Sequence, residues 1–98
     1  MKKFNGETYI NLNEIAMLVY DDWKDKNNPK CRAFLFELCE ILAEMKGGNA
    51  FSFYAEMQVQ PDRQSGKEWV TDGIRQAANR YSKLDIAKRL FSAAQANG

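Results

Sequence analysis

Apolar residues recur every three or four positions along several segments of the chain, which is the spacing of one face of an α-helix. The clearest such segment starts at Pro29 and ends near Gly47, a residue that suits a left-handed helix cap. Its apolar stripe consists of Cys31, Phe34, Leu35, Leu38, Leu42 and Met45. We expect this segment to form the central helix of the core.

Polar residues with capping chemistry predict where the first two helices begin. Asn11, with Glu14 three residues later, has the pattern of a capping box ahead of an apolar stripe. Asn28 followed by Pro29 is typical of an N-cap and a first-turn proline. The first helix should therefore start after Asn11 and the central one at Pro29.

The last third of the chain is also helical in its pattern. Ser82 with Asp85 is a further capping signature, which indicates a break between two helices. We expect these helices over residues 67–80 and 83–95, with one continuous helix as the alternative.

Two other segments favour extended chain. Asn5-Gly6 is a preferred two-residue turn, which predicts a β-hairpin over residues 1–10. Residues 51–60 alternate apolar and polar side chains, as in a strand with one buried face. Good helix formers lie in this segment as well, so a helix is the alternative there.

The predicted fold is α+β and predominantly helical, a single globular domain over residues 1–98. Four helices would pack with a small antiparallel sheet made of the N-terminal hairpin and strand 51–60. An all-α bundle of about five helices is the alternative. In the mixed fold the sheet keeps an open edge that needs a partner, and a second copy of the chain would close it as a homodimer.

Charge changes this picture only locally. The chain carries 14 basic and 13 acidic residues, so no whole-molecule field attracts nucleic acid or membrane. Near the C-terminus, however, basic residues face a single acid, Asp85. We take the following as candidates for contact with nucleic acid: Arg75, Arg80, Lys83, Lys88 and Arg89. Against a helix-turn-helix stands the absence of a glycine turn at Tyr81-Ser82.

The residue types present exclude several kinds of chemistry. The sequence has no histidine, which removes the commonest general base and most zinc sites. Cys31 and Cys39, eight residues apart on one helix, are separated by about 12 Å. That is too far for a disulfide, and both suit small buried thiols. We expect no catalytic residue, no metal ligand and no cofactor, hence no enzyme.

Aromatic residues are numerous, with six Phe, four Tyr and two Trp. Trp23 and Trp69 lie near helix ends, and the hydroxyl of a tyrosine prefers a wet edge. The candidates for a protein interface are Tyr20, Trp23, Tyr54 and Trp69. The favoured function is a small non-catalytic protein-interaction or regulatory module that binds another macromolecule, as a homodimer. The alternative is a nucleic-acid-binding regulator that uses the basic helix pair over residues 74–91.

No apolar run approaches the ~20 residues that a membrane span requires. We expect a soluble protein of the cytoplasm without membrane contact.

Overall fold

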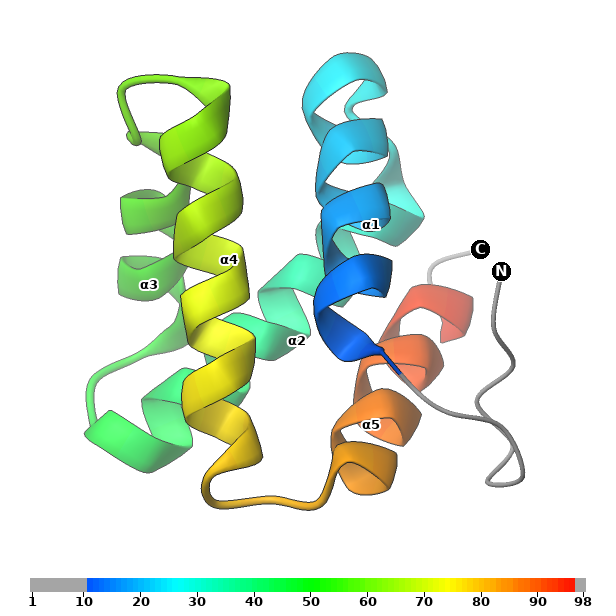
Figure 1. Ribbon diagram of the computed structural model, residues 1–98, viewed down its shortest axis with the longest axis vertical. Helices are drawn as coiled ribbons and strands as arrows, with labels where there is room; N and C mark the ends of the chain where they lie inside the picture. The colour runs from blue at the N-terminus through cyan, green and yellow to red at the C-terminus, as the bar shows by residue number, and fades with distance from the viewer. Residues whose placement is uncertain (1–10, 97–98) are drawn as a thin grey trace.

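The computed structural model describes residues 11–96, and every regular element in that range is an α-helix (Figure 1). The helices are α1 (Leu12–Lys26), α2 (Pro29–Lys46), α3 (Ala50–Gln58), α4 (Arg63–Ala78) and α5 (Lys83–Ala96). The α+β prediction is therefore wrong, and the all-α bundle of about five helices fits. The hairpin predicted for residues 1–10 lies outside the described residues.

The segment predicted as strand 51–60 is mostly helix α3, which begins at the cap residue Asn49. Its side chain accepts a hydrogen bond from the Ser52 backbone at 3.0 Å. Ala50 and Met57, two helical turns apart, face the core, whereas Phe51 and Tyr54 share another side of the helix. In a segment of nine residues, alternating apolar residues also fit the spacing of a helix face. The N-cap at Asn49 favours the helix over the strand. The homodimer predicted from an open strand edge loses this basis.

The predicted starts of α1 and α2 are confirmed. The side chain of Asn11 accepts from the Glu14 backbone at 3.0 Å, and that of Asn28 accepts from the Lys30 backbone at 2.9 Å. Between them, Asn27 ends α1 in the left-handed conformation, with φ 53°. Asparagine tolerates this conformation better than most residues, so the chain can turn sharply into α2.

The break before the last helix is confirmed too. Ser82 Oγ accepts from the Asp85 backbone at 3.1 Å, as in a capped helix start. Helix α4 begins earlier than predicted, at Arg63, because the side chain of Asp62 caps it.

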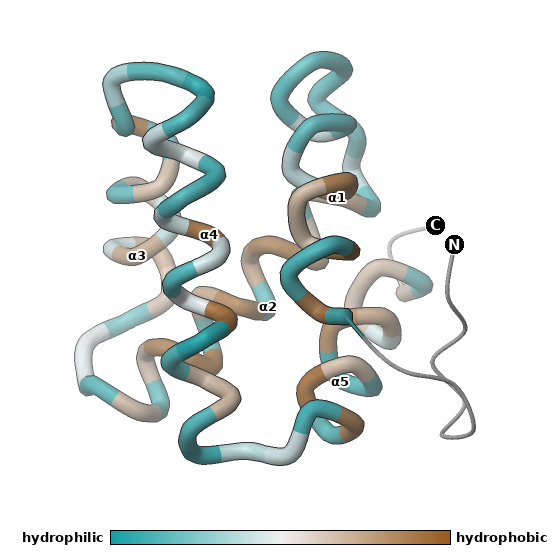
Figure 2. The backbone as a smooth tube through the Cα atoms, in the orientation of Figure 1, coloured by the Kyte–Doolittle hydropathy of each residue, from teal (hydrophilic) through white to brown (hydrophobic). Residues whose placement is uncertain are grey.

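Helix α2 is the centre of the molecule and packs against each of the other four helices. It crosses behind α1 and α4 in Figure 1, and hydrophobic residues are frequent along it (Figure 2). Leu35, Leu38 and Ile41 are fully buried, and residues from the other helices close the core around them. The central position predicted from the apolar stripe is thereby confirmed.

Helices α1 and α4 approach closely at one glycine. A Cβ atom at Gly66 would lie 1.8 Å from Tyr20 Oη and 2.6 Å from Tyr20 Cζ. Arg63 also bridges Asp21 and Asp25, and Lys67 Nζ lies 3.1 Å from Asp21. These contacts fix the end of α1 against the start of α4.

Within residues 11–96, no helix combines the length and the apolar composition that a bilayer crossing requires.

Candidate functional site

The four aromatic residues predicted for an interface lie in different environments. Tyr20 and Trp23 are core residues, with 1% and 7% of their surface exposed. Trp69 is half-buried beside Phe53 on α3. Tyr54 is half-buried as well and lines an open hollow of the described surface. The structure therefore does not bring these four residues together in one surface.

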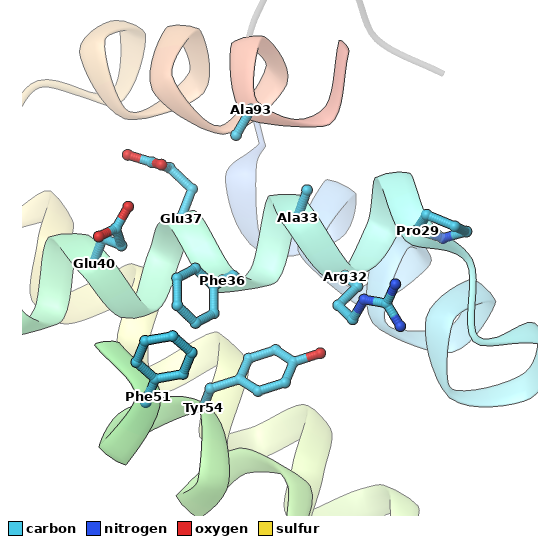
Figure 3. Close-up of a pocket in the computed structure, with 9 residues that line it drawn as sticks. All are labelled: Pro29, Arg32, Ala33, Phe36, Glu37, Glu40, Phe51, Tyr54 and Ala93. Atoms are coloured by element: carbon cyan, nitrogen blue, oxygen red, sulfur yellow. The ribbon is translucent and has the colours of Figure 1, made fainter. Parts of the chain in front are cut away.

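That hollow, which we call the aromatic groove, lies between α2, α3 and the end of α5 (Figure 3). Its volume is about 520 Å³. Its lining residues are Pro29, Arg32, Ala33, Phe36, Glu37, Glu40, Phe51, Tyr54 and Ala93. Phe51 is the most exposed aromatic residue of the groove, with 75% of its surface accessible.

The rings of the groove contact one another edge to face. The centroids of Phe36 and Phe51 are 5.1 Å apart, and those of Phe36 and Tyr54 are 5.5 Å apart. Tyr54 in turn lies 6.0 Å from the core residue Trp23. Such aromatic pairs are favourable beyond their buried area. The open rings are therefore supported by packing that continues into the core.

The two ends of the groove carry opposite charge. Arg32 lies at the Pro29 end, and Glu37 and Glu40 lie at the other (Figure 3). Glu37 accepts two hydrogen bonds from Arg89, at 3.0 and 2.7 Å. Glu40, which is exposed, makes no hydrogen bond or ion pair with any residue from 11 to 96. Its carboxylate is therefore available to an incoming cation.

A polar atom without a partner lies between these ends. The hydroxyl of Tyr54 is buried, points toward the Arg32 end of the groove and has no hydrogen-bond partner among the described residues (Figure 3). Burial raises the pKa of Tyr54 to about 12, an effect that the charge of Arg32 partly offsets. The phenol is therefore protonated at neutral pH and can donate a hydrogen bond.

Sequence analysis missed Phe36 and Phe51 as functional candidates. Phe36 is not among the residues of the predicted core stripe, and Phe51 belongs to the segment predicted as a strand with one buried face. The available signal was the three-residue spacing of Phe51 and Tyr54 behind Asn49, which predicts one helix face with two aromatic rings.

The five basic candidates divide into separate groups. Arg89 bridges Glu37 and Glu44 from α5 to α2, and its hydrogen bond to Glu44, the larger effect, and that to Glu37 raise the pKa of the guanidinium. Arg89 therefore links α5 to α2. Lys88 lies on the outward side of α5, beside Ser92. Neither residue lines the hollow that Arg75 and Lys83 share.

Arg75 and Lys83 come together, from α4 and α5, at a hollow of about 190 Å³. The first residues of α1, Asn11 to Asn13, complete its wall, so that two helices begin there. Asn13 Oδ1 is buried at this hollow and has no hydrogen-bond partner within the described chain. Arg80 is exposed in the turn between the two helices. We call this region, with Arg75, Arg80 and Lys83, the basic end.

The two thiols are poorly suited to nucleophilic chemistry. Burial raises the pKa of Cys39 to about 12. Burial and a hydrogen bond to Asp22 raise that of Cys31 to about 11. Both are protonated at neutral pH. Across residues 11–96, no group of three or more Cys, Asp or Glu side chains is arranged to hold a metal ion.

No protein-family model, curated protein sequence or solved structure matches the chain. The basic end and the aromatic groove are therefore the two features from which a function can be proposed.

Proposed function

We propose that the protein is a non-catalytic regulator that binds nucleic acid through the basic end. One observation carries this proposal: α4 and α5 bring Arg75 and Lys83 to the hollow where α1 and α5 begin. Helix N-termini carry partial positive charge, which attracts phosphate. In α1 and α5 the caps Asn11 and Ser82 already bind one backbone N–H group each, and Glu14 and Asp85 lie in the first turns, so the basic side chains must supply most of the attraction. Two such termini and basic side chains at one hollow suit a phosphodiester backbone.

The small net charge of the chain limits how strongly it can attract nucleic acid. The whole chain has a net charge of only +1, so attraction must come from the local cluster. Arg75 also pairs with Asp72 at 3.1 Å, an exposed contact that a phosphate can replace at little cost. A contact with about three phosphates would give a logarithmic salt slope near −2.7 on duplex DNA.

The experiment compares binding to duplex DNA, single-stranded DNA and RNA between about 50 and 200 mM salt, where such contacts weaken measurably. The variant Arg75→Gln/Arg80→Gln/Lys83→Gln should bind at least tenfold more weakly at the lower salt and show a flatter slope. The matched control, Lys24→Gln/Lys26→Gln/Lys30→Gln, removes three charges from the opposite end of α1 and the start of α2. Absence of binding to all three nucleic acids, or equal loss in both variants, would contradict the proposal.

A second candidate function is protein binding through the aromatic groove. It is favoured by the exposure of Phe51, which is 75%, inside an array of contacting rings. Aromatic residues placed in this way are enriched at protein interfaces. The partner that the charges of the groove fit is a second copy of the chain.

A further inference from the structure

The charged residues of the aromatic groove are arranged so that the grooves of two copies can be complementary to each other. Arg32, Phe36 and Glu40 follow one another at intervals of four residues, so they lie along one side of α2. Phe36 stands midway between the two charges, which are separated by about 12 Å along the helix. A two-fold axis near Phe36, perpendicular to α2, would place Arg32 of one copy opposite Glu40 of the other.

We propose that two copies of the chain dimerise across the aromatic groove with their α2 helices antiparallel. Arg32 of each copy then pairs with Glu40 of the second copy, and the two Phe36 rings meet near the axis. A parallel arrangement of the α2 helices would oppose like charges instead. Self-complementary contacts of this kind are the commonest form of oligomer.

Two further features of the groove find a role in this dimer. Phe51 loses its contact with water when it enters the groove of the second copy, and removal of apolar surface from water drives association. The Tyr54 hydroxyl, buried without a partner, points to the Arg32 end, where Glu40 of the second copy arrives. Because that oxygen is enclosed in the isolated chain, a hydrogen bond to the carboxylate requires the Tyr54 ring to shift toward the groove, and it would then satisfy the hydroxyl.

The oligomeric state of the full chain tests the proposal, measured by sedimentation equilibrium from 1 to 100 µM, roughly the range over which a weak to moderate dimer dissociates. The wild-type protein should dimerise, and Phe51→Ser should weaken the dimer at least tenfold. Val59→Ser is the matched control: Val59 is also 75% exposed, on the cap of α3, and does not line the groove. Circular dichroism establishes that each variant is folded.

Charge reversal distinguishes this arrangement from any other dimer. Arg32→Glu and Glu40→Arg alone should each weaken self-association at least tenfold, because like charges then meet across the axis. The double variant Arg32→Glu/Glu40→Arg should recover the dimer, and an equimolar mixture of the two single variants should form a heterodimer.

A wild-type chain that stays monomeric to 100 µM overturns the proposal, and the groove then faces a different protein or none. A dimer that resists Phe51→Ser and both charge reversals overturns it as well, since its interface lies elsewhere. The proposal rests on the second candidate function alone. Nucleic-acid binding is measured separately by its salt dependence, so failure of one leaves the other intact.

Discussion

The two sides of helix α2 have opposite roles, although they belong to the same 18 residues. On the inner side, Leu35 and Leu38 are fully buried in the hydrophobic core that the surrounding helices complete. On the outer side, Phe36 is covered mainly by Phe51 and Tyr54 of the short helix α3, which leaves the aromatic groove open. The comparison teaches that one helix can bury one side in the core and leave the other partly open: the inner side holds the fold, and the outer side is where we propose that a second copy of the chain binds.

The largest expected effect is on the inner side. Leu38→Ala should lower the free energy of unfolding by about 2 to 5 kcal/mol, because it leaves a cavity that the four packed helices cannot close. Chemical denaturation monitored by circular dichroism measures the change. A loss below about 1 kcal/mol would mean that the inner side is loosely packed and would remove the contrast between the two sides.

Next in size is the contact between α1 and α4. Gly66→Ala should cost about 1 to 3 kcal/mol, because the new Cβ would overlap the ring and hydroxyl of Tyr20. Gly73→Ala is the matched control, since its nearest neighbour, Leu42 Cδ1, is 3.4 Å away, an ordinary contact. Thermal unfolding should therefore separate the two variants, and an equal response would contradict the close approach of Tyr20.

The ion pairs at the edge of α2 should contribute less. Arg89→Met removes the bridge to Glu37 and Glu44 and should cost about 1 kcal/mol, a value limited by the exposure of Glu44. The hydrogen bond and charge of Arg89 hold the pKa of Glu44 below its ordinary value of 4.5.

This contribution has a defined pH dependence. A carboxylate with a lowered pKa stabilises the fold above its unfolded value and loses that effect as the pH falls through its folded value. Wild-type stability should therefore decline below about pH 4.5, and Arg89→Met should show a shallower decline, as measured by urea unfolding at several pH values. Parallel curves for both proteins would contradict the role of the bridge.

The smallest effect is expected on the outer side. At concentrations where the chain is monomeric, Phe51→Ala should change the free energy of unfolding by no more than about 0.5 kcal/mol, because the side chain is largely exposed. Val59→Ala should behave alike. If Phe51→Ala instead approached the cost of Leu38→Ala, the groove would be a structural element of the fold and the comparison would fail.

Local chemistry in the sequence predicted the helix boundaries best. The caps at Asn11, Asn28 and Ser82 involve residues at most three positions apart, so tertiary contacts are not needed to recognise them. The wrong prediction of a strand at α3 also came from local pattern. The alternation of apolar and polar residues favoured a strand, and the N-cap at Asn49 was overlooked in a helix of only nine residues.

The candidate surfaces were predicted less completely. Among the predicted interface residues, Tyr54 reaches the aromatic groove, while Tyr20 and Trp23 are in the core. Among the predicted basic residues, Arg75 and Lys83 share a hollow, while Arg89 is engaged with acids of α2. Residue type indicates what a side chain can contact, but not which helix will cover it.

By itself, the sequence determined the helical periodicity, the helix caps, the central place of α2 and the absence of histidine chemistry. These depend on residue types and on spacings of a few positions. Only the tertiary structure decided which aromatic rings stay open and which charges meet. Glu37 and Arg89 are 52 positions apart, and their pairing depends on the way α5 crosses α2. Phe51 is exposed for a similar reason, since the short helix α3 leaves one side of α2 partly uncovered.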